Sequence, residues 1–231
     1  MERTSADRNE TPRSLLTRTR KALGRVRRRF QLDRFDVFAR RVDPDLAFEA
    51  PEGYVFRFGT PEDIEGCDPF HTELDERERR EGVLRLSFGH QVVLGLHEET
   101  VVFSMWVHPR NINVPGSIKR RLGPHQSFIY KAFTSPEHRG RRLYGAGMRF
   151  VLCDLARQGK TELIGYAHVK KTVSRKGLAS LDFRSVGGFT DVEFPGFRRT
   201  LVSAELRDSF PEPLERSGVM RSHATSLQPS S

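Results

Sequence analysis

One short segment of the sequence concentrates residues that could bind an anion. It runs from Phe133 to Ala146 (FTSPEHRGRRLYGA) and contains three arginines and two glycines. An apolar strand is predicted before it and an amphipathic helix after it, so the segment leads into a helix N-terminus. Unpaired backbone N–H groups converge at such a position, and the helix dipole favours negative charge there. The pattern predicts a site for an anion such as a pyrophosphate.

The same segment resembles a known cofactor-binding motif. Placed between a strand and a helix, and with the turn Pro136–Gly140 (PEHRG), it resembles the acetyl-CoA-binding motif of the GNAT N-acetyltransferases, whose signature is Arg/Gln-x-x-Gly-x-Gly/Ala. Counted from Arg139, the signature places Arg142 and Tyr144 where the family usually has small residues. Counted from Arg142, it is met literally but lengthens the turn by three residues. The distance from the proline favours the count from Arg139.

Two other segments extend the resemblance over about 150 residues, from about 53 to 207. The stretch from Tyr54 to Asp63 (YVFRFGTPED) is similar to the family's opening strand and helix, and the stretch from Ala179 to Phe189 (ASLDFRSVGGF) to its closing helix. The resemblance implies an α/β (α+β) fold with a mixed, mostly antiparallel central sheet flanked by helices. It also implies acetyl-CoA as co-substrate, no metal, and direct transfer of an acetyl or short acyl group to a primary amine.

The resemblance assigns the cofactor contacts to backbone groups. Ala132 and Thr134 would hydrogen-bond the pantetheine arm where the sheet opens, and the amides from Arg139 to Tyr144 would bind the pyrophosphate. The implied cofactor-binding residues are Ala132, Phe133, Thr134, Arg139, Gly140, Arg141, Arg142, Leu143 and Tyr144.

The residues that move protons are less defined. Many family members use a tyrosine in the last helix as the acid, but the nearest match here is Phe183, which cannot donate a proton. The acid must then be another group, such as Tyr166, Ser174 or Ser180, or water. For the base, His168 has an ordinary pKa of about 6.5, which suits general-base catalysis. A lone histidine on a strand is more often structural, and Tyr130, the third candidate, lies on a strand where aromatic residues are usually core. The catalytic candidates are Tyr166, His168 and Tyr130.

The elements that must position these residues follow from periodicity and capping. Strands are predicted near 54–58, 91–96, 101–107, 127–134 and 162–169, and helices near 71–88, 141–158 and 177–186. Thr60 begins a helix with a capping box. The proline- and glycine-rich stretch 109–126 is predicted as a long loop. The resemblance implies that this loop and the helix at 71–88 flank the acceptor site. The basic residues of this stretch would suit a phosphorylated or nucleotide-linked amino sugar, or form a solvated surface: Arg110, Lys119, Arg120 and Arg121.

The ends of the chain differ from its middle. Residues 1–33 form a basic extension in which 12–30 has the spacing of an amphipathic helix. This helix could pack on its own domain, or lie on an anionic membrane or nucleic acid. Residues 34–52 are predicted as a short strand and linker, and 208–231 as a disordered tail.

Composition narrows the class of protein. The chain has 231 residues, a net charge of +9 and two cysteines, Cys67 and Cys153, so a disulfide framework is not expected. It lacks an 18-residue apolar run, and a cytoplasmic protein is expected. The sequence predicts an acyl-CoA-dependent N-acetyltransferase for a small-molecule amine, possibly an amino sugar in view of the basic stretch. The alternatives are a catalytically inactive CoA-binding module, docked on membrane or nucleic acid through its basic N-terminus, and a protein-lysine acetyltransferase. No oligomeric state is predicted.

Overall fold

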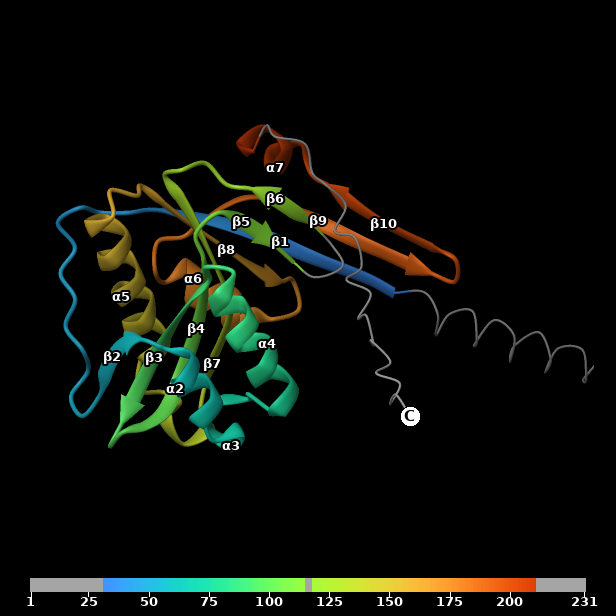
Figure 1. Cartoon of the computed structure of the whole chain (residues 1–231). Helices are drawn as coiled ribbons and strands as arrows, with labels where there is room; N and C mark the ends of the chain where they lie inside the picture. The colour runs from blue at the N-terminus through green and yellow to red at the C-terminus, as the bar shows by residue number, and fades with distance from the viewer. Residues whose placement is uncertain (1–30, 115–117, 211–231) are drawn as a thin grey trace, which may run out of the picture.

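A single eight-stranded sheet organises the molecule (Figure 1). The computed structural model describes residues 31–114 and 118–210, so the predicted helix at 12–30 and the tail beyond 210 lie outside the described residues. The strands are β1 (Gln31–Arg41), β2 (Val55–Phe58), β3 (Gln91–His97), β4 (Thr100–His108), β5 (Asn111–Asn113), β6 (Lys119–Arg121), β7 (Gln126–Thr134), β8 (Glu162–His168), β9 (Arg184–Phe194) and β10 (Phe197–Val202). The helices are α2 (Pro61–Gly66), α3 (Pro69–Thr72), α4 (Glu76–Ser87), the 3-10 turn η1 (Pro136–His138), α5 (Leu143–Arg157), α6 (Thr172–Ala179) and α7 (Ala204–Ser209).

The strand order is β10-β9-β1-β8-β7-β4-β3-β2. Every neighbouring pair is antiparallel except β7 and β8, which run parallel. The hairpin between β3 and β4 turns at Glu98 and Glu99, whose φ angles of 47° and 66° are those of a type I′ turn. The mixed, mostly antiparallel sheet confirms the predicted fold class.

Helices cover both faces of the sheet (Figure 1). On one face, α5 and α6 bury an apolar cluster with the strands that includes Phe103, Met148 and Leu178. On the other face, α2 to α4 pack over Trp106, while the β5–β6 hairpin and α7 pack over Phe128 and the strands beside it. The two clusters of this second face meet at the strand β7.

The capping box predicted at Thr60 is present and is strengthened by an ion pair. The Thr60 hydroxyl accepts the Asp63 N–H, and the Asp63 carboxylate accepts the Thr60 N–H at 2.8 Å. Arg57 also donates both terminal nitrogens to Asp63, at 2.5 and 2.6 Å. These donors lower the pKa of Asp63 from 3.8 to about 2, with the Arg57 hydrogen bond the largest cause.

We therefore expect Asp63→Asn to reduce the free energy of unfolding by about 1 to 2 kcal/mol at pH 7, because it weakens both the cap and the ion pair. The Asp63 pKa is lowered by folding, so its stabilisation is complete above about pH 5 and is lost progressively as the pH falls through 2. Urea unfolding at pH 7 and at pH 3 measures this. Equal losses at the two pH values would show that the carboxylate charge does not contribute.

The N-terminal boundary differs from the prediction. The segment expected as a short strand outside the domain is the eleven-residue strand β1, which lies between β8 and β9. Val37, Phe38 and Ala39 are consecutive and all buried, as in a strand covered on both faces. The packed part of the chain therefore begins by Gln31, and it extends beyond 207 because Phe210 is buried as well.

The stretch 109–126 is not the structureless loop that was predicted. It contains the β5–β6 hairpin, whose apolar side chains join the core at Ile112, Val114, Ile118 and Leu122. Arg120 is only 3% exposed, and its guanidinium lies 5.1 Å from the Phe210 ring centroid. The reading of Arg120 as part of a solvated surface was therefore wrong, because intervening prolines and glycines hid the apolar pattern of the hairpin.

The closing helix is also shifted. It was predicted at 177–186, but α6 spans Thr172–Ala179, and β9 begins at Arg184. Gly187 and Gly188 thus lie in a strand rather than at a helix end. A Cβ on Gly188 would come within 2.5 Å of the Phe35 carbonyl oxygen, so close strand packing explains this glycine.

Candidate functional site

The turn before α5 presents a row of unpaired amides. After η1, Gly140 and Arg142 take positive φ angles of 79° and 60°, and α5 then begins at Leu143. The first helical hydrogen bond runs from the Ala146 N–H to the Arg142 carbonyl. Within the described residues, the amides from Gly140 to Gly145 have no protein acceptor. The first turn of α5 holds no acidic residue, so nothing there opposes an anion.

The start of α5 helps to decide whether the signature is counted from Arg139 or from Arg142. Arg142 adopts the left-handed conformation at the position where the signature, counted from Arg139, has a glycine. Gly145 and Gly147 lie inside the helix, and a Cβ on Gly147 would stand 2.4 Å from the Phe103 ring. Gly147 is therefore explained by packing, and the geometry favours the count from Arg139.

The strands β7 and β8 part beside this turn. They are paired over only three residues, from Gln126–Glu162 to Phe128–Ile164, although β7 continues to Thr134 and β8 to His168. Ala132, Phe133 and Thr134 thus have no partner on β8. This parting is the opening into which the resemblance would place the pantetheine arm.

A bulge interrupts β7 inside the opening. Tyr130 pairs with Trp106 and Phe133 with Ser104, while Lys131 and Ala132 have no Cα partner on β4. Lys131 has a φ of 48°, and this bulge lets the successive side chains of Tyr130 and Lys131 both reach the face of the sheet that α4 covers. Tyr130 contacts His90 there, and Lys131 contacts Glu78 of α4. At Thr134 the carbonyl is already in use, since it accepts from Arg139 Nε at 3.2 Å.

Two of the three catalytic candidates lie together on the α4 face. The rings of Tyr130 and Tyr166 both stack on Phe128, with centroids at 5.8 and 5.6 Å. Each follows the last β7–β8 pair by two residues, so they stand on opposite sides of the opening. Burial raises the pKa of both phenols, so both are protonated at neutral pH.

His168, the third candidate, is held by neighbouring groups. Its Nε2 lies 3.1 Å from Asp33 Oδ1, and its Nδ1 accepts the Lys170 N–H at 3.1 Å. Its ring packs edge-on against Phe35. Both nitrogens are engaged, which favours a structural role for this histidine.

The other positions considered for the acid lie in α6 and in the residues after it, and α6 packs on the face of the sheet opposite α4. Phe183 is buried in the α5 and α6 cluster. Ser174 and Ser180 are exposed, and the Ser180 hydroxyl donates to the Gly177 carbonyl at 2.9 Å. These positions leave Tyr130 and Tyr166 as the candidate hydroxyl donors beside the opening.

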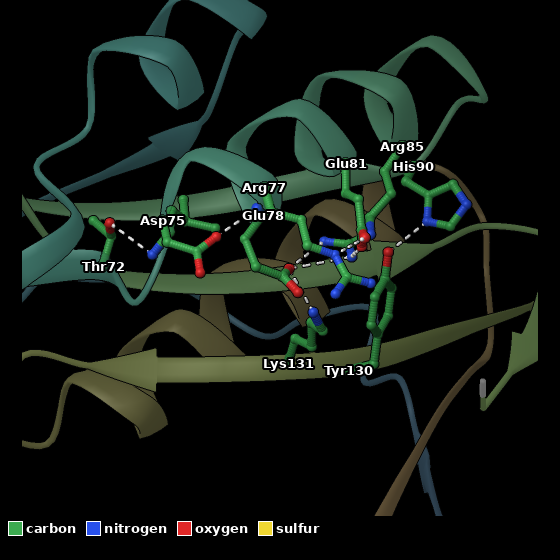
Figure 2. Close-up of polar contacts among 10 residues, drawn as sticks. Thr72, Asp75, Arg77, Glu78, Glu81, Arg85, His90, Tyr130 and Lys131 are labelled. Carbon is green, nitrogen blue, oxygen red and sulfur yellow. Dashed lines mark hydrogen bonds and ion pairs between the residues drawn. The ribbon is translucent and has the colours of Figure 1, made fainter. Parts of the chain in front are cut away.

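A charged network from α4 lies over β7 (Figure 2). Glu78 pairs with Lys131 at 2.6 Å and with Arg85 at 3.3 Å, and Arg85 also pairs with Glu81 at 2.8 Å. Burial opposes ionisation of Glu78, but these cations keep its pKa below the ordinary value. The single helix predicted at 71–88 is divided into α3 and α4, because Glu73 takes a left-handed φ of 52° and ends α3. Of the two helices, α4 contributes a half-buried carboxylate close to the opening.

His90 was not a candidate in the sequence, yet it binds Tyr130. Its Nδ1 lies 2.5 Å from the Tyr130 hydroxyl (Figure 2). It precedes β3 and follows Gly89, so in the sequence it looks like a turn residue. Only the pairing of β3, β4 and β7 brings it to Tyr130, and no local pattern signals that contact.

Comparisons with solved structures show what the fold of this chain is similar to. A GNAT-family acetyltransferase from Colwellia psychrerythraea is 13% identical, with a TM-score of 0.51, 71% of this chain covered and 57% of that one. A Drosophila protein is 12% identical, with a TM-score of 0.51 and coverage of 78% and 57%. A GCN5-related N-acetyltransferase from Sphaerobacter thermophilus is 14% identical, with a TM-score of 0.49 and coverage of 81% and 57%. No protein-family model and no curated protein matches the sequence.

The chain therefore has the fold of the GNAT acetyltransferases, and the resemblance inferred from the sequence is confirmed at that level. It spans 57% of the length of each of these three structures. In the described part of the chain, Cys67 and Cys153 are buried free thiols. None of the helices described is long and apolar enough to cross a membrane.

Proposed function

We propose that this protein is an acyl-CoA-dependent N-acyltransferase, which transfers an acetyl or other short acyl group from CoA to a primary amine. The observation that carries the proposal is the row of unpaired amides from Gly140 to Gly145, placed directly beside the parting of β7 and β8. An anion site and an adjacent strand opening suit a cofactor that joins a diphosphate to an extended arm. The GNAT fold supports the same reading.

The cofactor contacts follow the path from the turn to the sheet. The amides of Gly140 to Tyr144 would hold the diphosphate, and the side chains of Arg139, Arg141 and Arg142 add positive charge around it. The arm would lie along Ala132, Phe133 and Thr134 and bring the thioester to the β7 bulge. There the backbone of Lys131 and Ala132, which has no strand partner, would polarise the thioester carbonyl.

Direct transfer then requires a neutral amine close to the carbonyl carbon. The α4 face is the side from which we expect the acceptor, because the Glu78 carboxylate, with the cations Lys131 and Arg85 that pair with it, gives that side polar groups for a substrate. A small-molecule amine, for example an amino sugar, fits a site bordered by both carboxylates and guanidinium groups. Binding both reactants at this place would make the attack effectively intramolecular.

The test uses radiolabelled acetyl-CoA with three acceptors: glucosamine, putrescine and a lysine-containing peptide. We expect label to move to at least one acceptor and CoA to be released in equal amount. Acetyl-CoA binding without transfer to any of them would favour the inactive module, a reading supported by the buried Phe183 in place of the usual tyrosine. Preference for the peptide would favour a protein-lysine acetyltransferase.

A further inference from the structure

Two uncharged titratable side chains meet at the closed end of the opening. The Tyr130 hydroxyl and His90 Nδ1 are 2.5 Å apart, a short hydrogen bond for this pair of groups (Figure 2). Tyr130 lies just beyond the last β7–β8 pair, on the strand that continues to Ala132 and Thr134. A cofactor arm entering from the turn would therefore bring its thioester toward Tyr130.

The surroundings of His90 favour its neutral form. Three elements contribute titratable or charged groups: Arg85 from α4, His108 from β4 and Tyr130 from β7, with Arg110 following β4. The His90 and His108 rings are 4.0 Å apart between centroids. Partial burial first, and then Arg85 and Arg110, lower the pKa of His90 below 6.5. His90 is therefore a base that is ready to accept a proton at neutral pH.

Tyr130 is held in place by aromatic packing. Its ring stacks on Phe128 and lies 6.3 Å from Trp106, and the β7 bulge follows immediately at Lys131. Glu78 and Arg85 stand close enough to affect its titration. The hydroxyl is thus fixed between the opening and His90.

We propose that Tyr130 and His90 form a proton shuttle that takes a proton from the attacking amine and returns it to the departing sulfur. Tyr130 is the catalytic residue that touches the reacting atoms, and His90 acts through it. The proposal rests on the proposed acyltransferase function. The shuttle would provide the acid that protonates the departing sulfur, a role that Phe183 cannot perform because it has no hydroxyl.

The proton is conserved through the reaction. The amine nitrogen attacks the thioester carbon, an N–H proton passes to the Tyr130 oxygen, and the Tyr130 proton passes to His90 Nδ1. The C–S bond then breaks with its electron pair on sulfur. The His90 proton returns to Tyr130 as Tyr130 donates its own to the thiolate, which leaves amide, free CoA thiol and the original dyad.

The acidities of His90 and of the CoA thiol favour the second proton transfer. An imidazolium whose pKa is below 6.5 is a stronger acid than a thiol, whose ordinary pKa is about 8.5, so return of the proton to sulfur is downhill. Tyr130 alone would be a poor acid, since burial raises its pKa. His90 provides the proton that Tyr130 passes on.

The experiment measures CoA thiol release from acetyl-CoA with glucosamine, putrescine and the lysine peptide, between pH 5 and 8. The proteins are the full chain, His90→Gln, Tyr130→Phe and the double variant. His125→Gln is the matched control, because His125 is exposed on a loop away from the opening. Thermal unfolding of each variant verifies that it folds.

We expect each single variant to lose about 10²- to 10⁴-fold in kcat, and the double variant to lose no more than the worse single one. The acceptor amine titrates in the same way in the wild-type and the His90→Gln assays, so the ratio of the two rates removes its contribution to the pH dependence. It should fall as the pH drops through the His90 pKa, below 6.5, because the protonated ring cannot accept a proton. The His125→Gln protein should retain the wild-type profile.

Two results would overturn the shuttle. If the wild type is active but His90→Gln is within threefold of it, or if their ratio does not change with pH, His90 takes no part in proton transfer. If the wild type releases no thiol with any of the three acceptors, the proposed function fails and the shuttle with it. The two failures are distinguishable, because only the second appears in the wild-type protein.

Discussion

We expect the replacement of Gly140 by aspartate to abolish measurable acetyl-CoA binding, while the chain still folds. A carboxylate would stand in the turn whose amides, from Gly140 to Gly145, have no protein acceptor. Two like unit charges about 4 Å apart near a protein surface repel each other by about 4 kcal/mol. Repulsion of this size between the carboxylate introduced by Gly140→Asp and one charge of the diphosphate would weaken binding by about a thousandfold. The fold tolerates the change because no atom lies within 4 Å of the new Cβ, and aspartate accepts the φ of 79° better than most residues. Isothermal calorimetry measures the affinity.

Two controls isolate the charge from the backbone effect. Gly140→Asn has nearly the same shape without the charge, and we expect it to retain most of the affinity. Gly159→Asp places the same side chain at the other end of α5, where φ is 69° and the space is also open. If Gly140→Asp binds acetyl-CoA as tightly as Gly159→Asp does, the turn is not the diphosphate site.

Gly147→Ala is expected to lower the free energy of unfolding by about 2 kcal/mol. Its Cβ would stand 2.4 and 2.5 Å from two atoms of the Phe103 ring, and that ring is fully buried. Overpacking of this kind costs up to about 3 kcal/mol, and the higher helix propensity of alanine offsets about 1 kcal/mol. Urea unfolding without CoA measures the change.

Gly145 in the same helix provides the comparison. A Cβ there would approach only Leu181, at 3.9 Å, so Gly145→Ala should stabilise the chain by roughly 0.5 to 1 kcal/mol. Opposite signs for the two glycines would confirm that α5 sits against β4 as described. A stabilising Gly147→Ala would contradict that packing.

The parts of the fold that the sequence predicted are those with strong local signals. Thr60 carries its cap, its proline and its partner Asp63 within four residues, so the start of α2 follows from local chemistry. The strand, turn and helix from Phe133 onward combine apolar periodicity with a proline and glycines in the same way. Where capping, turn residues and periodicity agree over a few residues, the local structure can be predicted without knowledge of distant contacts.

The features that escaped prediction depend on distant partners. The strand β1 became central because β8 and β9 pair with its two edges, and no residue near Gln31 signals either partner. The hairpin at 109–126 depends likewise on the core that receives Ile112 and Leu122.

The candidate site likewise has one part that local sequence predicts and one part that depends on distant residues. The unpaired amides of the turn could be predicted, since a helix N-terminus always leaves such groups. The proximity of His90 to Tyr130 could not, because it requires the register of three strands and a bulge at Lys131. Proton-transfer partners in a sheet protein are set by pairing rather than by sequence spacing.

A crystal structure of the protein soaked with CoA would show directly whether the turn before α5 binds the diphosphate. We expect the diphosphate within hydrogen-bonding distance of the amides from Gly140 to Gly145, and the pantetheine arm between β7 and β8 with its sulfur near Tyr130. CoA bound elsewhere on the molecule, with the turn before α5 unoccupied, would contradict it.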